Sequence, residues 1–332
     1  MPRREMKNSS ADTLSPASSS YPLTLESDKA VADRFMYGRA DLVLPDYKLF
    51  KFRCEVDYVE VSVKVNKPTN FMTVREKLDC GYVQALDEGP GRAATQFAIR
   101  FDDPASRAHL LTALEPLRIH ANGFAEPPRL VKIEVALDAY SRNQDNFALL
   151  VMTSRFFRFG AEICSDNLRL AKFAGGVEWA ENPARFSLLL SRGYEVLVGD
   201  EDADIAQRIY LKTTDQSGNV HLPVQEHRAR REITLAGIEL EAANVAFPSR
   251  LLSSVVPWKF EALTKWFRFR KLRTGLTESP MQRIIADRRV LQGVRNEDRP
   301  KRRVYDRRVL ADTALNELAR DQLRELSRRF SS

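Results

Sequence analysis

Residues 56–65 read VDYVEVSVKV, and this stretch decides the fold class because its apolar and polar side chains alternate. Alternation with a period of two is typical of a β-strand that buries one face. Two later stretches have the same strand character, TQFAIRF within residues 94–101 and RLVKIEVALDAY at residues 129–140. The sheet that these strands predict is the centre of the first half of the chain.

Helix signals lie between these strands. Thr69 or Asn70 is placed to cap a helix through Leu78, and the residues Asp102-Asp103-Pro104 open a second helix. The order strand, helix, strand, helix, strand predicts an α+β fold with a largely antiparallel sheet covered by helices on one face.

The second half is also strand-rich. A helix is predicted at residues 146–159, with Arg192-Gly193 as a hairpin turn further along the chain. Whether this half duplicates the first α+β unit stays open. The predicted strands are residues 184–190, 194–199, 207–213 and 229–235.

The C-terminal quarter differs in charge from the rest. Residues 250–332 hold 21 basic and 10 acidic residues, whereas the other residues hold 31 and 35. An amphipathic basic helix is predicted at KFEALTKWFRFRKL and a second helix at residues 311–330. A basic arm indicates a polyanionic partner, nucleic acid rather than a membrane. The residues expected to bind nucleic acid are Lys259, Lys265, Arg268, Arg270, Lys271, Arg273, Arg288, Arg289, Lys301, Arg302, Arg303, Arg307 and Arg308.

We therefore expect three parts: a flexible leader at residues 1–40, an α+β domain at 41–250 and a basic, mainly helical extension at 251–332. The chain has no secretory signal and no apolar run long enough to span a membrane. Its three cysteines form no CxxC pair, so a reduced, cytoplasmic protein is expected.

Several enzyme classes lack their motifs. The sequence has no GxGxxG or GxxxxGK[ST] phosphate cradle and no GxSxG nucleophile turn. Its four histidines never occur as HxH or HExxH, which removes the common zinc-hydrolase spacing and the paired-histidine site of one class of DNA-nicking enzymes.

Polar strand faces remain as candidate chemistry. In QRIYLKTTD, the side chains of Arg208, Tyr210 and Lys212 share one face because the strand period is two. Neighbouring cations are expected to lower the pKa of the tyrosine, whose phenolate can attack a phosphodiester. From spacing alone, exposed cross-strand pairs of a half-buried sheet are the favoured explanation of such a face.

Carboxylates on two other strands complete this picture. Glu134 and Asp138 share a face of KIEVALD, and Arg230 and Glu232 share a face of HRARREITL. Carboxylates on adjoining strands suit Mg²⁺ or Mn²⁺, which polarises a scissile phosphate.

The segment YEVLVGDEDADIAQRIYLKTTDQSGNVHLPVQEHRARREITLAGIEL resembles the replication initiation factor family, which includes plasmid rolling-circle initiators and mobile-element relaxases. The family has a strand of the form R-aliphatic-Y-x-K, followed by a strand with an R-x-E pattern. These correspond here to residues 208–212 and 230–232, and the resemblance covers roughly residues 55–240. The upstream stretch PPRLVKIEVALDAYS resembles the family strand that carries acidic residues.

The resemblance implies a single-strand DNA endonuclease that nicks and rejoins DNA to start rolling-circle replication or transfer of a plasmid, phage or integrative element. It implies Tyr210 as the nucleophile, with Arg208, Lys212 and Arg230 as cationic neighbours. The metal ligands would be Glu134, Asp138 and Glu232, holding Mg²⁺ or Mn²⁺.

Two other hypotheses stay open: a non-catalytic DNA-binding protein of a mobile element, and a structural or assembly protein that binds nucleic acid. An origin-like DNA site, a host helicase and a second copy of the chain are the partners that these hypotheses allow.

Overall fold

The structure is a computed structural model, and it describes residues 44–78, 80, 82–87, 92–158, 160, 168–172, 176–177, 189–199, 203–215, 220–246, 250–254, 256–272 and 309–331. The predicted leader lies outside the described residues, and so do residues 273–308, which make up much of the basic arm.

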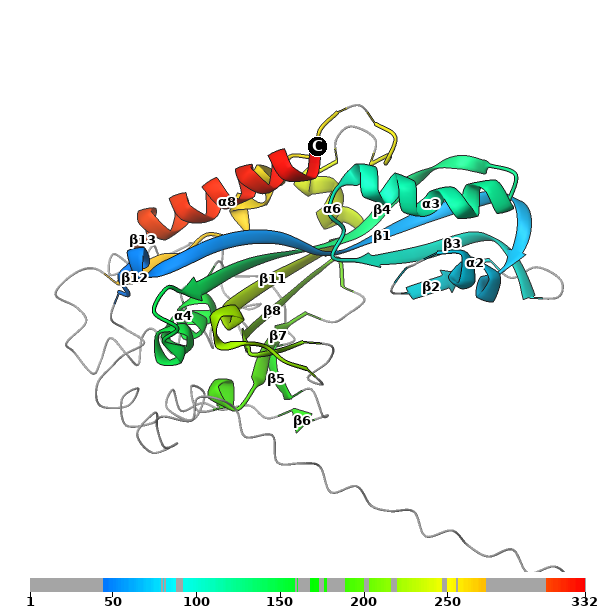
Figure 1. Cartoon of the computed structure of the whole chain (residues 1–332). Helices are drawn as coiled ribbons and strands as arrows, with labels where there is room; N and C mark the ends of the chain where they lie inside the picture. Colours follow the sequence, from blue (N-terminus) through cyan, green and yellow to red (C-terminus); the bar gives the residue numbers. More distant parts are fainter. Residues whose placement is uncertain are drawn as a thin grey trace, which may run out of the picture.

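One antiparallel sheet organises the molecule (Figure 1). Its nine strands follow the order β2-β3-β1-β4-β11-β8-β7-β5-β6. The two halves of the chain join where β4 pairs with β11. The strands are β1 (Phe50–Asn70), β2 (Tyr82–Ala85), β3 (Ala93–Asp102), β4 (Phe124–Ser141), β5 (Leu168–Lys172), β6 (Gly176–Val177), β7 (Tyr194–Val198), β8 (Ile205–Lys212) and β11 (Arg228–Ala236).

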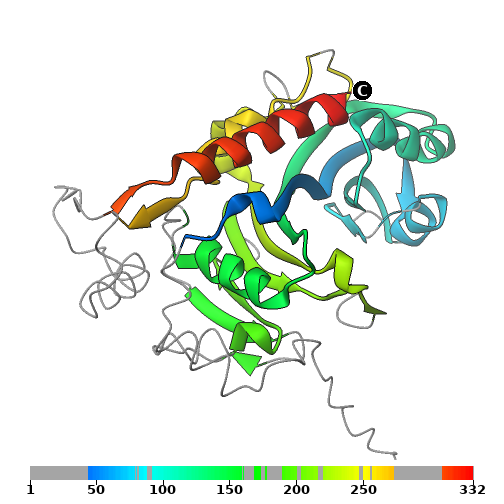
Figure 2. The same cartoon turned by 60° about the vertical axis from the view of Figure 1, so that its left-hand side comes forward.

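Helices cover one face of the central strands, as predicted. α4 (Asn146–Arg158) packs on β4, β8 and β11, and α8 (Thr313–Ser331) packs on β1. Figure 2 shows both helices in front of the sheet. α2 (Phe71–Lys77), α3 (Arg107–His120) and α6 (Gly237–Ala243) complete the helical set. We call the covered side the helix face and the opposite side of the central strands the open face. The predicted α+β class is confirmed.

Small elements sit around this body. Two short two-stranded sheets pair β9 (Thr214–Asp215) with β10 (Val220–His221) and β12 (Arg270–Leu272) with β13 (Val309–Ala311). Three 3-10 turns are η1 (Tyr47–Leu49), η4 (Val224–Glu226) and η5 (Phe260–Lys265). No helix within the described ranges is both long and apolar enough to cross a bilayer.

A β-bulge interrupts β1 at Asp57. Val56 pairs with Val135, but the next pair on β4 is Tyr58 with Glu134, so Asp57 is an extra residue. The alternation of residues 56–65 is therefore not strict: it slips by one position between Val56 and Val59. A bulge redirects side chains locally, and here it turns an acidic side chain toward the open face.

Three local predictions are wrong. The helix expected after Asp102-Asp103-Pro104 begins later, because the hydroxyl of Ser106 accepts the amide of His109 and caps α3. In the segment predicted as a strand at 184–190, residues 189 and 190 are helical, and residues 184–188 lie outside the described residues. The predicted amphipathic helix of the basic arm is instead the short turn η5 followed by β12.

The C-terminal helix is anchored on the body. Phe330 stacks on Trp258 with 5.1 Å between ring centroids, and it contacts Phe260 edge-on. Near the other end of α8, Asp312 forms a buried salt bridge with Arg155 of α4 at 2.7 Å. Arg329 donates to the backbone oxygen of Cys54 at 2.6 Å, which ties α8 to β1.

Candidate active site

Four cross-strand rows of side chains build the open face across β8, β11, β4 and β1. Pairing is in register, so residues opposite one another lie side by side, and neighbouring rows are about 7 Å apart along the strands. The rows are Ala206, Thr234, Glu134 and Tyr58; Arg208, Glu232, Ala136 and Glu55; Tyr210, Arg230, Asp138 and Arg53; and Lys212, Arg228, Tyr140 and Lys51. The first two rows carry the acids Glu134, Glu232 and Glu55, and the fourth carries three cations.

Tyr210 contacts a carboxylate directly. Its hydroxyl donates to Oε1 of Glu232 at 2.7 Å, and Nε of Arg208 donates to the other oxygen of the same carboxylate. Glu232 is fully buried, whereas the side chain of Arg208 is 38% exposed. The phenol is thus held by a buried acid, beside a guanidinium that solvent reaches.

Arg230 binds three carboxylates, those of Asp57, Asp138 and Glu232. It donates to both oxygens of Asp138, at 2.7 and 2.6 Å, in a bidentate pair. Its Nη1 also donates to Asp57 at 2.6 Å and to Glu232 at 3.3 Å. Burial lowers the pKa of Arg230, but these carboxylates, Asp138 first, outweigh burial and raise it.

Three carboxylates form a candidate cation site. One oxygen each from Asp57, Glu134 and Glu232 lies within 4.8 Å of the others. Burial, together with the nearby charge of Glu232, raises the pKa of Glu134 to about 8. Such crowding of negative charge is relieved by a bound cation, and an all-oxygen donor set suits Mg²⁺ or Mn²⁺. The residues present therefore fit a divalent ion.

This set differs in one member from the predicted ligands. Glu134 and Glu232 belong to it, but Asp138 does not, and both of its oxygens are bound by Arg230. Asp57 takes the third position. Sequence reasoning missed Asp57 as a site residue, although the phase slip after Val56 marks the bulge that places it there.

The expected activation of Tyr210 by cations is wrong for the protein without an ion. Tyr210 is 9% exposed, and burial raises the pKa of its phenol well above the usual value. The charge of Glu232 raises this pKa further, and the opposing effects of Arg208 and Arg230 are too small to compensate.

Lys212 lies one row from Tyr210 and pairs with Asp215 at 3.0 Å. Of the residues predicted to bind nucleic acid, Lys259, Lys265, Arg268 and Arg270 are exposed and Lys271 is half-buried. Lys265 lies over the ring of Trp266, 3.8 Å from its centroid. Arg273, Arg288, Arg289, Lys301, Arg302, Arg303, Arg307 and Arg308 lie outside the described residues.

Comparison with known proteins identifies no family for this chain. No family model matches the chain, and no curated protein sequence matches it. Among solved structures, it is similar to a rolling circle replication initiator protein from Geobacillus stearothermophilus, with a TM-score of 0.34 and 13% sequence identity. That match covers 70% of this chain and 91% of the other.

Proposed function

We propose that this protein cuts and rejoins one strand of DNA through Tyr210 and thereby starts rolling-circle replication or transfer of a mobile element. One observation carries the proposal: the phenol hydroxyl lies 2.7 Å from Oε1 of Glu232, a carboxylate of the three-carboxylate cluster. The R-aliphatic-Y-x-K and R-x-E motifs, on paired strands, support the same assignment.

In the proposed cutting reaction, Tyr210 is the nucleophile and Glu232 is the base. The phenol oxygen of Tyr210 bonds to phosphorus, and the bond from phosphorus to the 3′ oxygen breaks. The phenolic proton passes to Glu232, which already accepts it in a hydrogen bond. The 3′ oxygen takes a proton from solvent and leaves as a hydroxyl, and the 5′ phosphate stays on the tyrosine.

The other site residues position the reacting groups and neutralise negative charge. Arg208 orients Glu232 and is exposed enough to reach a phosphate oxygen. Arg230 fixes Asp57 and Asp138 by hydrogen bonds. Asp57, Glu134 and Glu232 would hold the divalent ion, which, when bound, polarises the scissile phosphate.

The test is capture of the covalent intermediate. Single-stranded oligonucleotides of random sequence, labelled at the 3′ end, are incubated with the full chain and Mn²⁺ and then run on a denaturing gel. We expect label on the wild-type protein and none on Tyr210→Phe. Tyr82→Phe is the matched control, since Tyr82 is an exposed residue of the edge strand β2, and it should retain the adduct.

A second function, DNA binding without cutting, is favoured by the burial of Tyr210 and its raised pKa. It predicts salt-sensitive retention of the same oligonucleotides with no labelled protein band. An adduct that persists in Tyr210→Phe would instead show that another residue is the nucleophile.

A further inference from the structure

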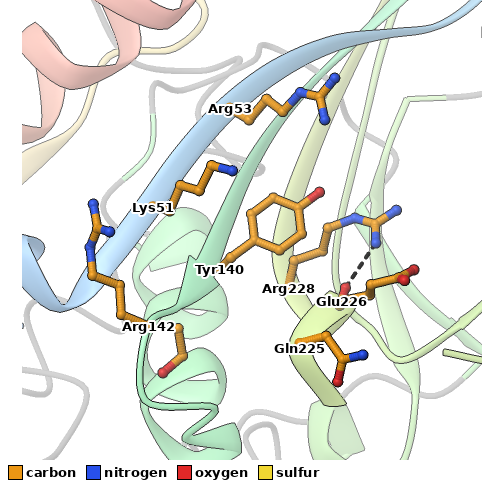
Figure 3. A pocket seen from close by; sticks show the side chains of 8 residues that line it. Lys51, Arg53, Tyr140, Arg142, Gln225, Glu226 and Arg228 are labelled. Carbon is orange, nitrogen blue, oxygen red and sulfur yellow. Dashed lines mark hydrogen bonds between the residues drawn. The ribbon is translucent and has the colours of Figure 1, made fainter. Parts of the chain in front are cut away.

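A basic pocket opens on the open face beside the candidate active site (Figure 3). Its volume is about 550 Å³, and β1, β4 and the start of β11 form its walls. Tyr140 projects into it between the cations of β1 and Arg228. The lining residues are Lys51, Arg53, Tyr140, Ser141, Arg142, Gln225, Glu226 and Arg228.

Positive charge dominates this lining. The lining holds four cationic side chains but only one carboxylate, that of Glu226. Arg142 uses Nε to bind the backbone oxygen of Lys48 at 3.1 Å, and Arg228 uses Nη1 to bind that of Glu226 at 2.9 Å. Both bonds are to neutral oxygens. Arg228 also lies 3.3 Å from Oδ2 of Asp138, and Arg53 pairs with Glu55 at 2.8 Å, whereas Arg142 forms no ion pair within the described part of the chain.

Two further groups are poorly satisfied. Lys51 is exposed and forms no ion pair within the described part of the chain. Nε of Arg228 is buried and makes no hydrogen bond there, although it lies 3.3 Å from Oδ2 of Asp138. A buried, unsatisfied donor of a charged group is costly, which indicates a site that is completed by an anion.

The pocket is continuous with the nicking site. Lys51, Tyr140 and Arg228 occupy the fourth row, one row from Tyr210 and about 7 Å away along the strands. Across the sheet, Arg228 is one strand from Tyr210, Tyr140 two and Lys51 three, which adds about 5, 10 and 14 Å. Asp138 links the two sites, because it binds Arg230 and lies beside Arg228. A single strand whose scissile phosphate lies at Tyr210 can reach the pocket within one or two nucleotides.

The geometry points to this pocket as the binding site for a phosphodiester one or two nucleotides from the scissile one on the same single DNA strand. Lys51, Arg142 and Arg228 hold that phosphate, and Tyr140 forms the wall between them. The inference rests on the proposed function for the identity of the ligand, but binding here needs neither the tyrosine nor a metal ion.

The test measures binding without chemistry. A fluorescent random-sequence single strand is titrated with the full chain in EDTA at several salt concentrations. Lys51→Gln/Arg142→Gln should weaken binding about ten-fold and reduce the slope of log affinity against log salt by about 0.7, the value for one lost phosphate contact on a single strand. Arg324→Gln/Arg328→Gln removes the same charge from exposed positions of α8 and should leave the slope unchanged.

The outcomes separate this inference from the proposed function. Equal slopes for the two double variants and the wild type would overturn the pocket, whether or not the covalent adduct forms. Loss of slope in the pocket variant without any wild-type adduct would keep the pocket and refute the cutting function. Competition by inorganic phosphate well beyond its effect on ionic strength would assign the pocket to a free phosphate ligand and overturn the strand assignment.

Discussion

Arg230 and Arg231 are adjacent on β11, both are buried, and they point to opposite faces of the sheet. Arg230 lies on the open face among the carboxylates Asp57, Asp138 and Glu232. Arg231 lies on the helix face, where it donates to the neutral oxygens of Phe156, Gln207 and Trp266. Asp138 and Glu232 raise the pKa of Arg230, whereas burial lowers that of Arg231 to about 9.

The difference separates two uses of a buried charge. On the open face, mutually dependent charges respond to a ligand that changes the local charge. On the helix face, the guanidinium of Arg231 joins the backbone oxygens of Phe156 and Trp266 and the side-chain oxygen of Gln207, and so holds separate segments together. The proposed function uses the charges of the open face, whereas Arg231 contributes to stability.

The largest expected effect comes from replacing each arginine by leucine. Arg230→Leu should lower the free energy of unfolding by about 3–5 kcal/mol, because it removes the bidentate partner of the buried Asp138 and one partner each from Asp57 and Glu232. Arg231→Leu should lower it by about 1–3 kcal/mol, the cost of unsatisfied neutral groups. Urea unfolding of both variants measures the two losses.

The pH dependence of these losses sharpens the comparison. Carboxylates stranded by Arg230→Leu have raised pKa values in the folded state, so protonation relieves the loss as pH falls from 7 toward 4. The oxygens stranded by Arg231→Leu do not titrate, and that loss should stay constant over the same range. Parallel pH profiles for the two variants would contradict the division between the faces.

A smaller effect is expected from the cation site. Glu134→Gln removes one oxygen ligand of the cluster and should weaken Mn²⁺ binding at least about ten-fold, as judged by calorimetry. Glu126→Gln is the matched control, because Glu126 lies on the same strand but is exposed and paired with Lys64. Equal Mn²⁺ affinity in the two variants would exclude Glu134 as a ligand.

The smallest effect concerns His227, a polar group of the helix face that contacts Asn146 and the backbone oxygen of Leu222. Burial lowers its pKa, so the unfolded chain takes up a proton first as pH falls below about 6.5. The stability from neutral His227 is complete above that pH and is lost as pH falls through the folded-state pKa. His227→Gln should flatten this dependence by less than about 1 kcal/mol in thermal unfolding, and exposed His221→Gln should not.

Much of the secondary structure follows from local patterns. Period-two alternation identified β1, β4, β8 and β11, and Asn70 caps α2 through its side chain as expected. These features depend on neighbours in sequence, which a single chain displays. The predicted helix at residues 311–330 is confirmed for the same reason, since its buried residues Leu315, Leu323 and Leu326 recur at helical spacing.

The sequence does not reveal which residues that are far apart in the chain come into contact. The grouping of Tyr210, Arg230 and Asp138 depends on the register of three strands, which turns and packing fix together. The basic arm misleads for another reason: Phe260, Leu263, Trp266, Phe267 and Phe269 are all buried, and no single helix face can present five such residues at this spacing. The segment instead turns through η5 and inserts its rings into the body.

The anchoring of α8 on β1 has a consequence for biosynthesis. β1 is the first strand of the central sheet to leave the ribosome, and the helix that shields its apolar side, Thr313–Ser331, is the last described element to do so. Cys54, whose backbone oxygen Arg329 of this helix binds, and its apolar neighbours must therefore stay uncovered by this helix until translation is nearly complete. Slowed synthesis of the intervening basic stretch would prolong that wait and increase loss of nascent chains to aggregation.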